Sequence, residues 1–348
     1  MSGPHREPRL VIVGNPGVIH VGSHFDQAAC SAGLKVTLCD VRAAFAGPRW
    51  LASMVWRLGG HRPLRLRQFS EEVVSVCRAT RPTWLLSTGL APLDARALAA
   101  IGRLGIQRYN FLTDDPWNPA HRAPWFFTAL PLYDRVFSPR LANMDDLRQL
   151  GCHEVSYLPF AYAPAVHFPE APPKSVAPRY ATDVVFLGGA DGDRIPVMSA
   201  VARAGFHVAL WGGYWARHPE TRAHARGHAD PRTVRHAIAG AKVGLCLVRR
   251  ANRDGHAMRS YELPAMGGCM LVERTDEHRS MFGDDGQAVV YFDGVESMID
   301  RLHWLIGHDH ERRRLATTAH RLIVDGQNTY RDRLAAILGN SARTTHVA

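Results

Sequence analysis

The 348-residue sequence predicts an α/β protein made of two tandem parallel-sheet domains. Short apolar runs are followed by glycine-containing turns and then by segments of helical periodicity, and this alternation occurs twice. Between the two occurrences, from Pro159 to Pro178, prolines are too dense for a helix or a central strand. We therefore place the boundary between the two domains in this stretch.

Strands and helices are expected to alternate in each half. In the first half the strands are expected at 10–13, 36–39, 83–87 and 108–112, with helices at 22–32 and 94–103. In the second half the strands are expected at 183–187, 206–211, 243–248 and 269–273, with helices from about 195 and over 231–239 and 260–266. The tail over 295–338 follows helical periodicity, with Met298, Leu302, Leu305 and Ile306 on one apolar face. The expected domains are 1–163, a linker over 164–180, a second domain over 181–320, and a helix over 321–340 that packs back on the first domain.

Composition excludes several classes of protein. With 46% hydrophobic and 21% charged residues, the chain has the usage of an ordinary globular protein rather than a disordered one. Six cysteines without a C-x-x-C pair indicate neither a zinc knuckle nor a dithiol site, and they fit reduced thiols in the cytoplasm. We expect no export signal, because the first apolar run, at 10–13, is too short for one, and no apolar stretch approaches the roughly 18 residues of a membrane span. Any contact with a membrane would be peripheral.

The formal net charge of +10, most of it from arginine, indicates an anionic partner, because the guanidinium fork suits phosphate. Charge alone does not decide between nucleic acid, an acidic membrane face and a phosphorylated small molecule. We expect no nucleic-acid partner, because the basic residues gather around one candidate pocket and no recognition-helix motif occurs.

The most informative stretch runs from Arg253 to Glu273, after an expected strand. A loop with two arginines and a histidine leads there into a short helix, so that cations and free backbone N–H groups meet at one place and would stabilise a diphosphate. Asp254 and Glu262 stand eight residues apart, and carboxylates so placed accept hydrogen bonds from sugar hydroxyls. Composition alone leaves open a solvated loop with an ordinary helix cap.

This stretch, continued through Thr275, Asp276, His278 and Phe282, resembles the donor-binding region of GT-B glycosyltransferases, most closely the CgeB-like (spore-protein type) family. Matching segments follow in the same order at 185–189 with Arg194, 210–212 with Trp215, 241–246, and Arg321, Tyr330 and Arg333, and more loosely at 113–116 and 157–161. The resemblance covers most of residues 105–335. It implies two Rossmann-like domains facing a cleft. It also implies a hexosyltransferase-like enzyme that uses a nucleotide diphosphate sugar as substrate, needs no metal or cofactor and transfers the sugar to an unidentified acceptor hydroxyl.

The resemblance also implies roles for single residues. Asp254 and Glu262 match the acidic positions of the E-x7-E motif of retaining enzymes, with aspartate replacing the first glutamate, so that Asp254 would face the transferred sugar and Glu262 the ribose. Arg259 and Arg194 would hold the diphosphate in place of a metal. The other expected donor-binding residues are Gly188, Gly189, Trp211, Gly212, Gly227, His228, Arg253, His256, Ser260 and Tyr261.

On the acceptor side, Asp114 and Asp115 follow an expected strand of the first domain. One of them would be the general base of an inverting reaction, or would orient the acceptor in a retaining one; the alternative is an aspartate that caps the turn before Pro116. Gly17 and His20, in and after the first glycine-rich turn, are further acceptor-side candidates.

We give less weight to four other interpretations of the sequence. Asp191-Gly192-Asp193 has the D-x-D pattern that binds a divalent ion in GT-A enzymes. His224 and His228 would share a helical face and could pair on a metal, although no third ligand accompanies them. The turn from Gly14 to Gly17 lacks a full dinucleotide fingerprint, so it does not indicate a dehydrogenase. Finally, the same fold could belong to a catalytically silent nucleotide- or carbohydrate-binding protein.

Overall fold

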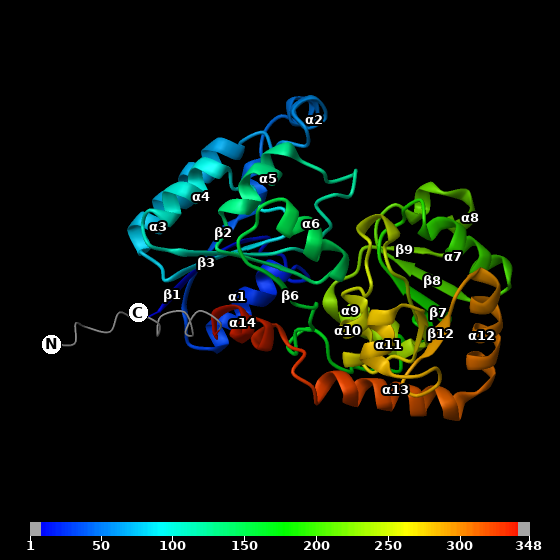
Figure 1. Cartoon of the computed structure of the whole chain (residues 1–348). Coiled ribbons are helices and arrows are strands. Elements are labelled where there is room, and N and C mark those ends of the chain that lie inside the picture. The colour runs from blue at the N-terminus through cyan, green and yellow to red at the C-terminus, as the bar shows by residue number, and fades with distance from the viewer. Residues whose placement is uncertain (1–7, 340–348) are drawn as a thin grey trace. The chain divides into compact units, whose positions relative to one another are not determined.

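Each half of the chain builds one six-stranded sheet in which all strands are parallel. The structure is a computed structural model that describes residues 8–339 (Figure 1). Residues 1–7, where no export signal is expected, lie outside this range, as do residues 340–348. The first unit contains the chain up to Pro159, the short piece Ala251–Arg253 and the residues from Tyr330 onward. The second contains Phe160–Arg250 and Asp254–Thr329.

The first sheet has the strand order β2-β1-β3-β4-β5-β6. Its strands are β1 (Arg9–Gly14), β2 (Lys35–Asp40), β3 (Trp84–Thr88), β4 (Gln107–Phe111), β5 (Arg135–Ser138) and β6 (Val155–Tyr157). The helices of this unit are α1 (Val21–Ser31), α2 (Arg49–Leu58), α3 (Leu66–Thr80), α4 (Ala95–Gly102), α5 (Pro124–Ala129), α6 (Met144–Gln149) and α14 (Tyr330–Gly339).

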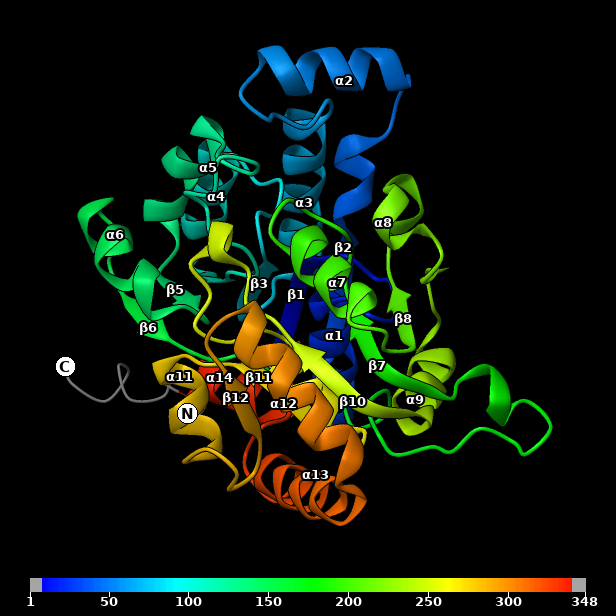
Figure 2. The ribbon, with the colours of Figure 1, turned by 90° about the vertical axis from the view of Figure 1, so that its right-hand side faces the viewer.

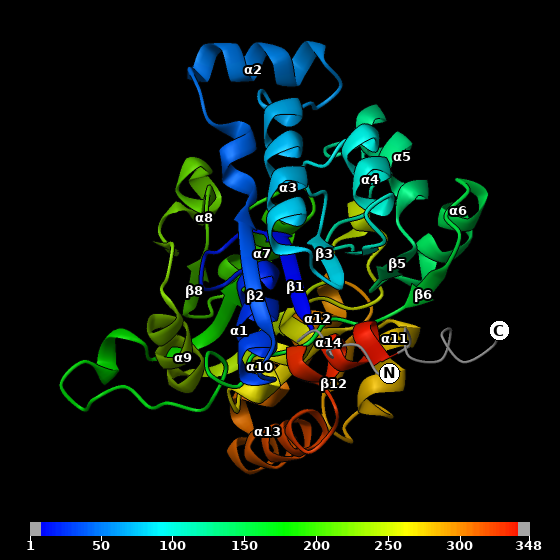
Figure 3. The same ribbon diagram turned by 90° about the vertical axis from the view of Figure 1, so that its left-hand side faces the viewer.

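Both faces of the first sheet are covered. Val11 and Val13 of β1 belong to a core with residues of α3 and α4, whereas α1 and α14 contact each other on the other side of the sheet (Figures 1 and 3). Leu10 and Ile12, which alternate with those valines, are also buried, as strands of a parallel sheet require. The expected return of the C-terminal helix is therefore confirmed, although α14 begins at Tyr330, later than residue 321.

The second sheet has the order β12-β11-β10-β7-β8-β9. Its strands are β7 (Thr182–Leu187), β8 (Val208–Trp211), β9 (Ala225–Gly227), β10 (Ala241–Cys246), β11 (Met270–Glu273) and β12 (Val290–Phe292). Its helices are α7 (Arg194–Arg203), α8 (Pro219–Arg222), α9 (Pro231–Gly240), α10 (Arg259–Ala265), α11 (Asp276–Phe282), α12 (Val295–Gly307) and α13 (Asp309–Val324). Helices α7 and α12 share one core with the strands, and α12 buries the expected Met298, Leu302 and Leu305 (Figure 2).

Each sheet has a point where the strand order reverses, between β1 and β3 in the first and between β7 and β10 in the second. Open α/β sheets bind ligands outside the carboxyl ends of the strands at such a point. The two Rossmann-like sheets predicted from the sequence are confirmed. Among the described residues, no helix is both long and apolar enough to cross a membrane.

Candidate functional site

In the turn after β7, the backbone of Gly188 lies directly against the backbone of Gly212, which follows β8. Gly212 has φ +143°, and a Cβ there would lie 2.2 Å from the carbonyl oxygen of Gly188. That oxygen accepts a hydrogen bond from Trp215 Nε1 at 2.7 Å, and the N–H of Gly188 donates to the Trp211 carbonyl at 2.8 Å. Position 212 therefore requires glycine, because a side chain there would collide with the backbone of the turn after β7.

Arg194, the first residue of α7, lies beside this turn. Its Nη1 donates to the carbonyl of Gly189 at 3.2 Å, and its guanidinium lies 5.4 Å from the centre of the Phe186 ring. Burial lowers the pKa of Arg194, with Asp191 acting in the opposite direction. Its buried Nε has no hydrogen-bond partner within the described part of the chain. The structure therefore holds a dehydrated cation at the carboxyl end of β7.

Asp191 joins this arginine to a second one. Its Oδ1 accepts the backbone N–H groups of Asp193 and Arg194 at 3.2 and 3.0 Å. Its Oδ2 lies 3.4 Å from Arg194 Nη1 and 3.7 Å from Arg249 Nε. The first carboxylate of the D-x-D pattern thus caps the start of α7 and pairs with two arginines, while Asp193 is exposed.

Arg259 and Glu262 form an ion pair across one turn of α10. The Nε of Arg259 also donates to the carbonyl of Leu187, the last residue of β7, at 3.1 Å. The carboxylate of Glu262 is 1% exposed, whereas the arginine is 34% exposed. The buried Glu262 therefore positions the half-buried guanidinium of Arg259 at the end of β7. Arg194 contacts the turn that follows the same strand.

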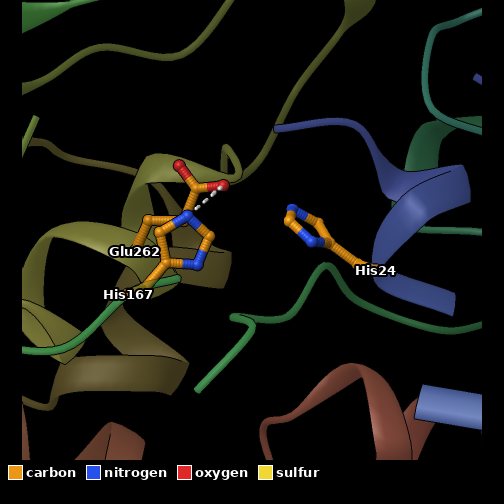
Figure 4. A group of neighbouring side chains, drawn as sticks. All are labelled: His24, His167 and Glu262. Carbon is orange, nitrogen blue, oxygen red and sulfur yellow. Dashed lines mark ion pairs between the residues drawn. The ribbon is translucent and has the colours of Figure 1, made fainter. Parts of the chain in front are cut away.

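His167 is the second neighbour of Glu262 (Figure 4). Its Nδ1 accepts the N–H of Ala163 at 3.0 Å, so the ring proton of the neutral form lies on Nε2. Nε2 is 3.6 Å from Glu262 Oε1 and faces it. Arg259 and His167 therefore both place N–H groups against the buried carboxylate of Glu262.

Behind α10, a buried network holds the start of the helix. His278 Nδ1 donates to the Glu273 carbonyl at 2.8 Å, so its Nε2 accepts from Ser260 Oγ at 2.7 Å. Ser260 Oγ in turn accepts the N–H of Ala257 at 3.0 Å. Burial lowers the pKa of His278 to about 4. A serine and a histidine that are both fully buried therefore hold the start of α10 in place.

His256 serves the loop before α10 in a similar way. Its Nε2 accepts the N–H of Phe160 at 3.3 Å, and its Nδ1 donates to Glu277 at 2.5 Å. Glu277 in turn approaches Gly255 so closely that a Cβ at 255 would lie 2.2 Å from a carboxylate oxygen. His256, Ser260 and Tyr261 are thus buried behind the loop, whereas the arginines lie at the strand ends.

Asp254 and the pair Gly227–His228 complete the expected donor set. Asp254 closes the loop after β10, because its Oδ2 accepts the N–H of Arg249 at 3.3 Å and its own N–H donates to the Arg249 carbonyl. The carbonyl of Gly227 accepts the N–H of Gly212 at 2.8 Å, and the exposed His228 ring lies beside Gly213. His224 precedes β9 and His228 follows it, so the two histidines do not share a helical face.

In the first unit, Asp115 is 1% exposed and bound on both oxygens. It accepts from Arg253 Nε at 2.6 Å, from Asn143 Nδ2 at 3.0 Å and from the N–H of Trp117 at 2.9 Å. Arg253 also pairs with Asp146 at 2.7 Å and has φ +51°, a strained conformation for a residue with a side chain. Arg253, expected to bind the donor, is thus engaged with two carboxylates of the first unit.

Asp114 is 33% exposed and accepts from Asn252 Nδ2 at 3.1 Å. Gly17 and His20 lie together on the turn after β1, where a Cβ at 17 would be 2.7 Å from the His20 ring. Burial and the charge of Arg42 lower the pKa of His20. The acceptor-side candidates therefore occupy the carboxyl ends of β4 and β1, separated by β3 in the same sheet.

Two residues of the site are missing from the sequence-based prediction. Arg249 directly follows the end of an expected strand, which was a usable signal. His167 stands alone in a proline-rich segment, where nothing in the sequence indicates that it meets Glu262.

No curated protein has a matching sequence. Residues 194–339 match the family described as glycosyl transferase-like. Among solved structures, sucrose-phosphate synthase from Thermosynechococcus elongatus has a TM-score of 0.67 at 11% identity, with 98% of this chain and 99% of that chain covered. HepE from Anabaena, solved with UDP and glucose, has a TM-score of 0.64 at 12% identity, with 97% and 100% covered. The α,α-trehalose 6-phosphate synthase from Burkholderia multivorans has a TM-score of 0.64 at 13% identity, with 97% and 100% covered.

Identities this low establish the fold rather than the substrate. Coverage of nearly the whole chain in all three cases means that both sheets, and not one alone, correspond. The chain therefore has the GT-B fold, and its residues 194–339 are similar to the glycosyl transferase-like family.

Proposed function

We propose that the protein is a metal-independent, retaining glycosyltransferase that moves a hexosyl group from a nucleotide diphosphate sugar to an acceptor hydroxyl, and that it is related to the CgeB-like enzymes. The observation that carries this proposal is the gathering of Arg194, Arg249 and Arg259 around the ends of β7 and β10, beside a turn stripped of side chains at Gly188 and Gly212. Fixed cations at the reversal point of a parallel sheet suit a diphosphate.

In the proposed reaction the bond between the anomeric carbon and the β-phosphate oxygen breaks, and negative charge develops on the departing nucleoside diphosphate. Arg194 and Arg259 stabilise that charge without reorganising, because both are already held by carbonyl oxygens. The acceptor oxygen bonds to the anomeric carbon, and in a retaining reaction its proton passes to the departing phosphate.

The remaining roles belong to the same proposal. Glu262 binds the ribose and Asp254 faces the transferred sugar, while Gly227 and His228 lie near the base. Asp114, the more accessible of the two first-unit aspartates, orients the acceptor, and Asp115 positions the loop. HepE, a protein of similar fold solved with UDP and glucose, supports a nucleotide-sugar donor. We place the reaction in the cytoplasm, in keeping with six unpaired cysteines.

A thermal-shift screen across nucleoside diphosphates and their sugars tests the proposal. At a concentration of 100 Kd, a bound nucleotide adds about 2.7 kcal/mol of stability, whereas inorganic phosphate should add little. The shift should survive EDTA. The nucleotide that binds is then supplied as its sugar, and the anomeric configuration of the product is read by NMR. A chain that responds to no nucleotide would refute the donor site. Tight binding without transfer or hydrolysis on any acceptor would indicate the catalytically silent alternative.

A further inference from the structure

Helix α2 is attached to the first unit by one face only. None of its residues is fully buried, and the helix lies apart from the strands at one end of α3 (Figure 3). Its inner face carries Trp56, whose ring lies 6.1 Å from that of Phe45 and 5.0 Å from that of His61. His61 in turn donates from Nδ1 to the Arg122 carbonyl at 2.8 Å. These ring contacts place the Trp56 side of the helix against the first unit.

The opposite face is apolar and exposed. Trp50, Met54 and Leu58 are 70%, 45% and 83% exposed, and their spacing of four residues places them in one stripe. Single exposed apolar residues are ordinary. Trp50, Met54 and Leu58 are three large apolar side chains aligned on a helix that has no fully buried residue. Such a patch indicates an interaction surface.

The charge around this stripe has one sign. Residues 41–70 contain six arginines and no aspartate or glutamate. Arg49 and Arg57 occupy the helical stripe next to the apolar one, and Arg62 and Arg65 follow the helix. Among residues 8–339, no carboxylate forms an ion pair with any of these four. An apolar stripe bordered by unpaired arginines complements a surface that is apolar below and anionic above.

We propose that α2 docks the protein on an anionic lipid bilayer. The helix lies in the plane of the membrane, with Trp50, Met54 and Leu58 at the boundary between headgroups and acyl chains and the arginines on lipid phosphates. Trp56 and His61 hold the helix in that orientation on the first unit. A two-fold contact with a second copy would bring the same arginines face to face, which like-charge repulsion opposes.

Vesicle flotation of the full chain tests this. We expect binding to vesicles of phosphatidylglycerol and phosphatidylcholine, little binding to pure phosphatidylcholine, and weaker binding as salt is raised. Trp50→Ser combined with Leu58→Ser should weaken binding at least about tenfold, and Arg57→Gln about fivefold. The matched control is Leu141→Ser with Leu322→Ser, which removes leucines that are 54% and 43% exposed elsewhere and should leave binding unchanged.

Substitutions on the outer face remove no buried contact, so the melting temperature and its shift with nucleotide should stay as in the wild type. Brominated lipids should quench tryptophan fluorescence in the wild type and less so in Trp50→Phe. Equal binding to both kinds of vesicle, or full binding by the Trp50/Leu58 variant, would overturn the proposal. So would a dimer, detected by analytical ultracentrifugation, that the Trp50/Leu58 variant dissociates while vesicle binding persists.

Discussion

The two sheets share an architecture but differ in the charge at their carboxyl edges. The first sheet presents Asp114 and Asp115 after β4, whereas the second presents Arg194 after β7 and Arg249 after β10. Both edges neutralise part of this charge by a local partner: Arg253 pairs with Asp115, and Asp191 pairs with Arg194. The strands therefore supply similar platforms, and the loops decide the chemistry.

The charged groups at the two edges also differ in their exposure to solvent. Asp115 is completely enclosed and its oxygens are taken by neighbouring groups, so this carboxylate is part of the frame of the first unit. Arg259, by contrast, is held by one carbonyl and by Glu262 and remains one-third exposed. An ionic group that is positioned but still accessible can meet a ligand directly, whereas a carboxylate with both oxygens occupied, such as Asp115, supports the surrounding loop. Of the two proposed catalytic cations, Arg259 belongs to the first kind, whereas Arg194 is largely buried.

The largest expected effect tests this distinction in the second unit. Arg259→Ala should lower kcat for sugar transfer by about 10²–10³-fold, because it removes a fixed donor to the departing phosphate, while the apparent affinity for the donor changes less. Steady-state kinetics with the nucleotide sugar identified in the screen provides the measurement. Arg250→Ala is the matched control, since Arg250 lies on the same loop, 75% exposed and paired only to Glu273 among the described residues.

Glu262→Gln tests whether Glu262 acts by orienting Arg259. Because Glu262 orients Arg259, the double variant should lose less than the sum of the two single losses. Additive losses would mean that the ion pair has no part in the site, and wild-type kinetics in Arg259→Ala would remove the arginine assignment altogether.

The second prediction tests whether the hydrogen bonds of the buried Asp115 stabilise the first unit. Asp115→Ala should lower the free energy of unfolding by about 3 kcal/mol, because it leaves buried donors of Asn143 and Trp117 without an acceptor. Asp146→Ala removes the other carboxylate that pairs with Arg253, but Asp146 is 32% exposed, so the loss should stay below about 1 kcal/mol. Urea unfolding measures both. Equal losses would show that burial does not distinguish the two carboxylates.

Sequence patterns predicted most of the central strands and several of the helices, but strand β5 and the long amphipathic helix α3 were missed. Buried strands such as β1 and β7 are continuous apolar runs, and their boundaries lie within two residues of those expected. The short edge strands β6, β9 and β12 were missed, because three residues are too few to show a period. Helix α2 was missed as well, and its exposed stripe shows why: its pattern does not report a buried face.

The site was predictable where residues are close in sequence and unpredictable where they are close only in space. Arg259 and Glu262 lie one helical turn apart, so the sequence places them together. The contact of His167 with Glu262 joins residues that stand far apart in the chain, and no local pattern encodes it. The ion pair of Arg253 with Asp115 likewise joins residues that are far apart in the sequence.

The smallest predicted effect concerns a feature that the two units share. Burial lowers the pKa of His278 in the second unit, and of His24 in the first, to about 4. Both are neutral in the folded protein, whereas an unfolded histidine titrates near 6.5. Between these values the unfolded chain binds more protons, so stability is present above about pH 6.5 and falls as the pH drops toward 4.

At pH 5, each such histidine should cost about 2 kcal/mol relative to neutral pH. His278→Gln should therefore flatten the acid limb of a plot of unfolding free energy against pH, whatever it does to stability at pH 7, because glutamine does not titrate. His153→Gln, at an exposed histidine of the first unit, provides the control and should leave the slope unchanged. If the slope in His278→Gln matched that of the wild type, the network of Ser260 and His278 behind α10 would not be the acid-sensitive element of the second unit. The two units would then differ in their response to acid as they do in charge.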